Sequence, residues 1–523
     1  MQIPDGHATP VAAISKNPSQ RRATVDTLVL RPQWSAPAEP LRHTWEGVVN
    51  IDQFRWMVRR DVQDQLALVQ RELRARHVRA VGMFDDEMRV YRPGPGAFMG
   101  YEPDEPRTNW QIVDYVIDSL LDRDLHPMFT TSFVPSAMAG GPVTVFTTKA
   151  HTSPPADWKA WARLVQDGVR HAIERHSAEV VRQWYFEVWN EPNLDGWFWG
   201  GDRDAFLQLW KTTHDAIKSV DASLRVGGPS CARGEWVEEL LEFGAKHDCA
   251  PDYIVAHTYN NDSPADKALA PFAGAQAAQN STSPDFASTT IRNLRRALNT
   301  RGYRGEVHWN EWGRSFHGVD RRRETANEAA FAVRLLSDVS QDADAFAYWC
   351  LSDIYDQVGY GREAFHGGYG LLSLQGLRKP AYHAFQLLSR LGTQRVSVVS
   401  DDADTFRNVI VTAPENGRAH ALVYAYAHDD PTTPASLKVS IELPSNARPG
   451  ALYRIDSTEN NVITRWKDLG APAYLSRAQT AALAAVDQLQ PSRTPVKLDH
   501  DASRSFAHFT METPGVALLE IEC

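Results

Sequence analysis

Two short segments of the sequence place a glutamate beside an asparagine and among aromatic residues. One is Trp189-Asn190-Glu191-Pro192, and the other, 120 positions later, is Trp309-Asn310-Glu311-Trp312. Each segment ends a run of residues that is typical of a β-strand. Two glutamates on separate strand ends can cleave a glycosidic bond, because one protonates the leaving oxygen and the other meets the cationic sugar carbon as an anion.

These glutamates need a scaffold that brings both strand ends to one place, and the sequence predicts one. Between residues 41 and 390, apolar strand-like runs alternate with amphipathic helical stretches, of which Asp61–Leu73 is the clearest. Eight strand–helix units predict an α/β fold, a (β/α)8 TIM barrel, in which every strand delivers its carboxyl end to the same face. A doubly wound sheet is the alternative, but no glycine-rich nucleotide turn follows the first strand. The predicted barrel strands are Gly47–Asn50, His77–Met83, His126–Phe133, Tyr185–Glu191, Arg225–Ser230, Tyr253–Tyr259, Glu306–Trp312 and Ala345–Leu351.

A second, all-β part is predicted from the last quarter of the chain. Over residues 391–523, short alternating strands separated by Gly and Pro turns predict an accessory β-sandwich, with a helical insert at Ser476–Gln488. We expect the N-terminal segment 23–40 to add a strand to this sandwich. Residues 1–22 are polar and predict a disordered tail.

The charge and residue composition of the chain exclude several kinds of binding partner and cofactor. The net charge is −10 and no basic block is present, so neither nucleic acid nor an anionic membrane is an expected partner. Residues 1–22 contain no apolar stretch of the signal-peptide kind, which favours a cytoplasmic location. The four cysteines fit neither a zinc pattern nor a disulfide framework, and no metal-binding motif or phosphate loop occurs, so neither a metal nor a cofactor is expected. The oligomeric state is left open.

Several further residues are candidates for binding a sugar near the two glutamates. The side-chain amide of Asn190 could hold a hydroxyl group, and Trp197 and Phe198 could stack on a sugar ring and desolvate a nearby acid. Strand alternation puts His257 and Tyr259 on one face, where the tyrosine hydroxyl could hydrogen-bond the anionic glutamate.

Two other strands contribute candidates of their own. Arg79, on the second strand, is expected to support the site, and Trp349, on the eighth strand, is expected to form its floor. Asp356 follows the eighth strand in an acidic stretch on the same face and is a further candidate for sugar binding.

From about residue 40 to residue 520 the chain resembles glycoside hydrolase family 39, the β-xylosidases and α-L-iduronidases, and among these it is most like a bacterial β-xylosidase. The run Trp184–Leu194 is the most specific match. The other matching stretches are Asp85-Asp86, Asn109-Trp110, Ser132–Pro135, Gly227–Pro229, His257–Tyr259, Glu311, Tyr348-Trp349, Ser352-Asp353 and Phe365–Gly368.

The resemblance implies an enzyme that retains the anomeric configuration through a covalent glycosyl–enzyme, with Glu191 as acid/base and Glu311 as nucleophile. It also implies that Asn190, His257, Tyr259, Trp349, Phe133 and Phe365 line a xylose site. The chain departs from many relatives at Val81, where they carry His, and at Asp356-Gln357, where they carry two acids. Both departures bear on the choice of sugar.

The resemblance implies an exo-acting β-xylosidase (xylan 1,4-β-xylosidase) that degrades xylo-oligosaccharides. An α-L-arabinofuranosidase or an α-L-iduronidase on the same scaffold is the alternative, although the acids of Tyr348–Gln357 would repel an iduronide. More distant alternatives are a non-catalytic sugar-binding protein and a serine hydrolase that uses Ser230 in a near-match to a nucleophile elbow. The segment Asn260–Ser283 follows the sixth strand and is expected to limit access to the site.

Overall fold

The chain is described by a computed structural model that covers residues 26–91, 108–262, 283–355, 357, 361–428, 435–501 and 504–523. The predicted N-terminal tail, Asp356 and most of the predicted rim segment Asn260–Ser283 lie outside these residues. Among the described helices, none is both long enough and apolar enough to cross a lipid bilayer.

Eight parallel strands form the central sheet, and their neighbours follow the order of the chain. The first and last strands also meet, because the amide of Leu351, just after the last strand, donates to the carbonyl of Asn50 in the first at 2.9 Å. The predicted (β/α)8 barrel is therefore confirmed. Its strands are β3 (Val48–Gln53), β4 (His77–Val81), β5 (His126–Thr130), β8 (Tyr185–Glu187), β9 (Arg225–Ala232), β10 (Tyr253–Tyr259), β11 (Glu306–Gly313) and β12 (Ala345–Tyr348).

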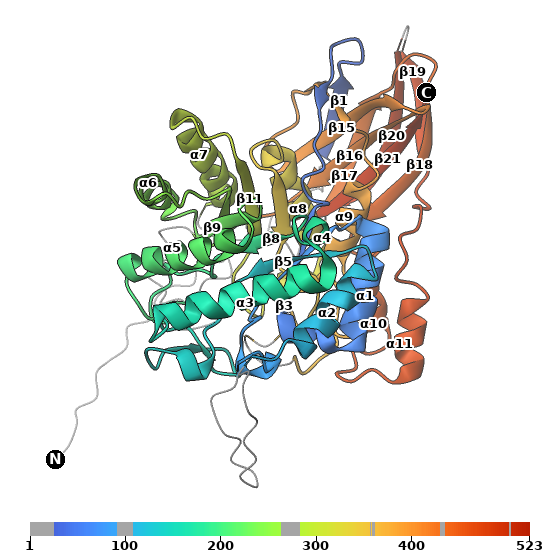
Figure 1. Cartoon of the computed structure of the whole chain (residues 1–523). Helices are drawn as coiled ribbons and strands as arrows, with labels where there is room; N and C mark the ends of the chain where they lie inside the picture. Colours follow the sequence, from blue (N-terminus) through green and yellow to red (C-terminus); the bar gives the residue numbers. More distant parts are fainter. Residues whose placement is uncertain are drawn as a thin grey trace, which may run out of the picture.

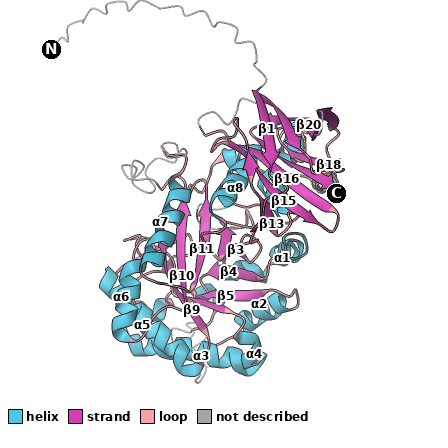
Figure 2. Ribbon diagram, turned by 90° about the horizontal axis from the view of Figure 1, so that it is seen from above, coloured by secondary structure: helices cyan, strands magenta, loops and turns pink. Residues whose placement is uncertain are grey.

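Helices surround this sheet, as the view from above shows (Figure 2). The first helix buries one apolar stripe against the strands, made of Val62, Leu66, Val69 and Leu73, whereas the helix Ala326–Val339 is buried on nearly all sides because it also packs on the sandwich. The sequence did not predict the helices Val237–His247 and Pro380–Leu388, which complete the ring. The helices are α1 (Arg60–Leu73), α2 (Gln111–Leu121), α3 (Trp158–His176), α4 (Ala178–Val181), α5 (Arg203–Val220), α6 (Val237–His247), α7 (Phe286–Thr300), α8 (Ala326–Val339) and α9 (Pro380–Leu388).

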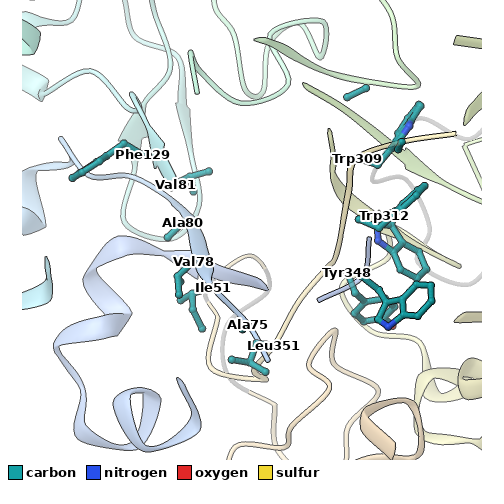
Figure 3. Close-up of a cluster of buried hydrophobic side chains, with 14 of the residues drawn as sticks. Ile51, Ala75, Val78, Ala80, Val81, Phe129, Trp309, Trp312, Tyr348 and Leu351 are labelled. Atoms are coloured by element: carbon teal, nitrogen blue, oxygen red, sulfur yellow. The ribbon is translucent and has the colours of Figure 1, made fainter. Parts of the chain in front are cut away.

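The main core lies between the strands and these helices. Figure 3 shows Trp309 and Trp312 of β11 beside Tyr348 of β12 in this core, with Ile51 and Val78 of the first two strands among the other labelled side chains. Both tryptophans are fully buried, and Trp312 packs edge-on against Tyr348 at 5.3 Å. The aromatic residues on either side of Glu311 therefore build the core and do not face a substrate.

Two antiparallel-rich sheets form the predicted β-sandwich, beside α8 (Figures 1 and 2). One has the order β14-β1-β17-β20-β19 and the other β18-β21-β16-β15-β13-β2. The N-terminal strand β1 runs parallel to β17, and its Leu28 and Leu30 are buried between the sheets. The strands are β1 (Asp26–Pro32), β2 (Glu39–Pro40), β13 (Gln394–Val396), β14 (Val398–Val399), β15 (Arg407–Glu415), β16 (Arg418–Ala425), β17 (Ala435–Glu442), β18 (Arg448–Ile455), β19 (Lys497–Asp501), β20 (Arg504–Thr513) and β21 (Gly515–Glu522).

The helical insert of the sandwich contains two short helices, α10 (Val462–Asp468) and α11 (Arg477–Ala484). A capping box of Ser476 and Gln479 starts the second helix. Trp466 of α10 packs edge-on against Phe365 at 5.3 Å, so the insert touches a loop of the barrel.

Candidate active site

Glu191 and Glu311 lie together at the carboxyl end of the barrel, each only 6% exposed. His257 lies between them, with its Nδ1 atom 3.1 Å from Oε1 of Glu191 and 3.7 Å from Oε2 of Glu311. The ligand atoms of the three side chains all lie within 4.8 Å of one another. One imidazole and two carboxyl groups thus share a small, buried volume.

The backbone turns sharply to present Glu191. The predicted strand Tyr185–Glu191 ends at Glu187, because Trp189 and Glu191 adopt left-handed φ angles of 70° and 46°. Such angles cost non-glycine residues about 1 kcal/mol or more and persist only where the surroundings enforce them. Here the amide of Glu191 donates to the carbonyl of Ser230 at 2.9 Å. The turn keeps Glu191 on the inner side of the barrel, two residues beyond a fully buried Trp189.

A β-bulge presents Glu311. In the pairing of β10 with β11, Ala256 faces Trp309 and His257 faces Glu311, so Asn310 is an extra residue without a partner. A bulge breaks the strict alternation of side chains. It allows both Asn310 and Glu311 to reach polar groups inside the barrel while Trp309 packs in the apolar core.

The buried side chain of Arg79 connects several of the predicted site residues. It is fully buried on β4, and its guanidinium donates to Asn190 Oδ1 at 2.7 Å and to Glu311 Oε2 at 3.4 Å. It also approaches Nε2 of His257 at 3.3 Å. The predicted supporting role of Arg79 therefore corresponds to direct contacts with three of the predicted site residues.

Tyr259 donates its hydroxyl to Oε1 of Glu311 at 2.6 Å, which is the contact that strand alternation predicted. Tyr259 and Trp349 belong to one aromatic cluster with Tyr355 and Tyr369. Trp349 packs edge-on against Tyr369 at 6.4 Å and is 3% exposed. This cluster forms the apolar wall beside Glu311.

Burial sets the protonation of the site. It raises the pKa of Glu191 to about 7, against the opposing charges of Arg79 and Arg233. It also raises the pKa of Glu311 to about 7; His257, Arg79 and the Tyr259 hydroxyl act in the opposite direction, and the charge of Glu191 adds to the rise. Burial lowers the pKa of His257 to about 4, so this imidazole is neutral near pH 7.

Two carboxylates and an imidazole so close together could in principle hold a metal ion. The contacts of His257 argue against that use. Arginine has only donors, so Nε2 of His257, which faces Arg79, accepts, and the proton of the neutral ring lies on Nδ1. Nδ1 then donates to Glu191 and offers no lone pair to a metal. The arrangement of these three side chains suits proton transfer.

The predicted aromatic residues divide into two groups. Phe133 is fully buried and packs with Trp189 at 5.4 Å and with Phe198 at 6.3 Å, while Trp197 is 39% exposed at the rim. Phe365 is fully buried in a different cluster, against Trp466 of the insert. Its described contacts do not join it to either glutamate.

Two other sequence features, Ser230 as a possible nucleophile and the acidic stretch after β12, have different surroundings from those expected. Ser230 is fully buried at a bulge of β9, and the group beside its hydroxyl is the carboxylate of Glu187, whose pKa is lowered despite burial by the ion pair with Arg79, which makes it a poor base. A serine nucleophile would need a base within hydrogen-bond reach. Asp353, in the acidic stretch after β12, forms a fully buried ion pair with Lys379 at 2.6 Å, so its charge is neutralised within the fold.

Sequence reasoning missed Glu187, Asn310 and Asn50 as members of this network. Glu187 is fully buried and accepts from Nε of Arg79 at 2.9 Å and from Nη2 at 2.8 Å. A signal was present, since a charged residue inside an apolar strand run is rarely buried unless it is paired. Asn310 gave no such signal, because the bulge that directs it inward is invisible in the pattern of residue types.

Comparison with known proteins agrees with this geometry. The family model of glycosyl hydrolases family 39 matches residues 30–501. A β-xylosidase of Caldicellulosiruptor saccharolyticus is 32% identical over 83% of this chain and 86% of its own, and one of Geobacillus stearothermophilus is 28% identical over 85% and 86%. The crystal structure of a monomeric β-xylosidase from Caulobacter crescentus superposes with a TM-score of 0.80 at 27% identity, covering 95% of this chain and 99% of that one. With a family match over most of its length and a paired-glutamate site, the chain belongs to glycosyl hydrolases family 39.

Proposed function

We propose that this enzyme is a retaining β-xylosidase that removes xylose from the non-reducing ends of xylo-oligosaccharides. The observation that carries the retaining mechanism is the close approach of the carboxyl groups, since one carboxyl oxygen of Glu191 lies within 4.8 Å of one of Glu311. Retaining glycosidases hold their carboxyl groups about 5–5.5 Å apart, whereas inverting enzymes need about 6.5–9.5 Å to admit a water molecule.

Glu311 is the proposed nucleophile. Of the two glutamates it has the stronger set of donors, the hydroxyl of Tyr259 at 2.6 Å and the guanidinium of Arg79 at 3.4 Å. Donors that bond the charged form stabilise it, so the single negative charge of the pair is held on Glu311. An anionic oxygen is thereby available to attack the anomeric carbon.

Glu191 is the proposed acid/base. Burial keeps it protonated up to about pH 7, and its described side-chain hydrogen bond is the one with His257. As Glu311 forms its bond to the anomeric carbon, Glu191 gives its proton to the departing glycosidic oxygen. The resulting carboxylate then takes a proton from a water molecule that attacks the same carbon and releases Glu311.

Asn190 and Trp349 are the proposed sugar-binding residues closest to this chemistry. Because the amide oxygen of Asn190 faces Arg79, its NH2 group is the part left to donate to a sugar hydroxyl. Trp349 offers an apolar face from the aromatic cluster around Tyr259. We propose Trp197 and Phe198 as the rim that receives the rest of the substrate, with Phe133 packed behind Phe198, and Asp356 and Phe365 as further contacts.

The choice of a xyloside is supported by the relatives, which are named β-xylosidases at 27–32% identity over most of the chain. The experiment is a comparison of aryl β-D-xyloside, α-L-arabinofuranoside and α-L-iduronide as substrates, with the first sugar product followed by NMR. We expect the xyloside to give the highest kcat/KM and to release β-xylose before mutarotation. Initial release of α-xylose would overturn the retaining mechanism, and a preference for either other glycoside would overturn the substrate.

A further inference from the structure

A third carboxylate lies beneath the two at the active site. Glu187 ends β8, four residues before Glu191, and is fully buried. Its two oxygens accept three hydrogen bonds, two from Arg79 at 2.8 and 2.9 Å and one from Nδ2 of Asn310 at 2.8 Å. Glu187 thus joins β8, which leads to Glu191, with β4 and with β11, which carries Glu311.

The two bonds from Arg79 fix the plane of its guanidinium. A bidentate arginine–carboxylate pair holds both position and orientation, whereas a single bond leaves the long arginine side chain free to rotate. Apart from a contact with Oδ1 of Asn50 at 3.4 Å, the remaining donors of Arg79 face Asn190, His257 and Glu311 at 2.7, 3.3 and 3.4 Å. The geometry of these three contacts depends on the clamp made by Glu187.

The pair also balances charge. Arg79 is completely buried, and a buried cation without a counter-charge is strongly unfavourable. The carboxylate of Glu187 neutralises it at 2.8 Å. Arg79 can then act on Glu311 as a hydrogen-bond donor without presenting a full uncompensated positive charge, which would make the Glu311 carboxylate too stable an anion to attack.

We propose that Glu187 is a positioning residue: through Arg79 it orients the Asn190 amide, fixes the proton of His257 on Nδ1 and sets the charge felt by Glu311. It does so without touching the substrate. This inference rests on the proposed function, because it assigns Glu187 a task within the retaining mechanism of Glu191 and Glu311.

The test compares two variants. Glu187→Gln keeps the shape of the side chain and removes its charge. Glu187→Asp keeps the charge but shortens the side chain, which moves the carboxylate away from Arg79. For Glu187→Gln we expect kcat on an aryl β-xyloside to fall at least about 100-fold, a loss typical of a misplaced catalytic group. We expect KM to change less than about threefold. The acid limb of the pH profile should move to lower pH, because the uncompensated Arg79 favours ionised Glu311. For Glu187→Asp we expect a lower kcat with the acid limb unmoved.

Glu72→Gln is the matched control. Glu72 makes a bidentate pair with Arg378 at 2.6 and 2.9 Å, between α1 and the start of α9, outside the site. This variant should lower the melting temperature and leave kcat and the acid limb as in the parent enzyme. A folded Glu187→Gln enzyme with the parent kcat and acid limb would overturn the inference. If Glu187→Gln does not fold, an acid limb that moves in Glu187→Asp would overturn it instead. Failure of the parent enzyme to cleave the xyloside would count against the proposed function and not against the role of Glu187.

Discussion

At the residue scale, Glu311 can be tested by removing its carboxylate alone. Glu311→Ala leaves Tyr259 and Arg79 facing an empty space where the nucleophile was. We expect kcat on an aryl β-xyloside to fall by about 10³-fold or more. Added azide, a small anion that fits this space, should restore part of the activity and give the α-xylosyl azide. The measurement is the rate of phenol release with and without azide, together with NMR of the product.

The matched variant is Tyr259→Phe, which removes the hydroxyl at 2.6 Å and keeps the carboxylate. It should lower kcat without any response to azide. An azide response of the same size in both variants would contradict the assignment of Glu311.

Glu191 is tested through the leaving group. In Glu191→Ala no acid protonates the departing oxygen, so we expect kcat/KM to fall by about 10²–10⁴-fold for a xyloside with a poor leaving group such as xylobiose. An activated nitrophenyl leaving group needs no proton and should be affected much less in the first step. The alkaline limb near pH 7, which reports loss of the proton of Glu191, should disappear. Equal losses with both leaving groups would show that Glu191 is not the acid.

The sequence predicted the two glutamates and Tyr259 because each lies at or near the end of an apolar strand run, where side chains of a barrel converge, and it predicted Arg79 as a charged residue within the second strand run. It did not reveal Glu187, although that residue lies on the same predicted strand as Glu191. The motif drew attention to the end of the strand, whereas the network depends on a pairing with Arg79 across more than one hundred positions of sequence.

At the element scale, the strand ends differ from the prediction for a physical reason. The residue pattern extended the fourth strand to Glu191, but left-handed φ angles at Trp189 and Glu191 end it at Glu187. The bulge at Asn310 similarly changes which side chains of β11 face inward. Both irregularities depend on hydrogen bonds to neighbouring strands, and a pattern of residue types along one segment cannot encode them.

The helical insert gives the second element-scale prediction. Trp466 of α10 is 4% exposed and packs against Phe365, which the family resemblance assigns to the sugar site. Trp466→Ala removes this support and should raise KM for the xyloside about threefold or more, with a smaller change in kcat. Loss of a buried tryptophan also costs about 3–5 kcal/mol locally. Steady-state kinetics at a temperature where the variant is folded provide the measurement.

Trp34→Ala is the control for this experiment, because Trp34 packs on the sandwich core and its indole donates to the carbonyl of Glu442. It should lower the melting temperature and leave KM unchanged. If both variants raise KM equally, the effect is one of general stability and the insert has no specific role.

At the scale of the whole molecule, the active site costs stability. Glu191 and Glu311 form a buried pair, each with a pKa raised from 4.5 to about 7. The pair keeps a proton in the folded state that the unfolded chain loses, so stability falls as pH rises from about 4.5 to 7. Glu311→Gln removes this penalty. We expect its melting temperature to exceed that of the parent by about 2–5 °C at pH 8 and to match it at pH 4.

Glu306→Gln, on the same strand, should change the stability at high pH in the opposite direction. Hydrogen bonding by His308 lowers the pKa of Glu306 to about 2, so this carboxylate contributes stability above about pH 4.5 that is lost as pH falls through 2. The variant should melt at a lower temperature than the parent at pH 8. Thermal denaturation of the three proteins at both pH values tests the pair, and a lower melting temperature for Glu311→Gln at pH 8 would contradict the prediction.

The architecture could be predicted because it depends on the order and number of elements, which apolar runs report well. Eight strands, a later all-β region and an early strand were all visible in the pattern. The helices Val237–His247 and Pro380–Leu388 were missed, although Val237–His247 is as long as the predicted helix Gln111–Leu121. We propose that the boundary between the barrel and the β-sandwich lies near residue 390.

The pairing of β1 with β17 sets a constraint on how the protein is made. Leu28 contacts Val439 in register, so residues separated by more than four hundred positions become neighbours. A ribosome adding about 5–20 residues per second needs roughly 20–80 s to synthesise that interval. For most of this time β1 lacks both of its partner strands, β14 and β17, so a nascent chain that already holds a complete barrel still carries an unpaired apolar strand. Chaperones that shield such strands would therefore bind the N-terminal strand β1, and they would still be needed there after the barrel has been synthesised.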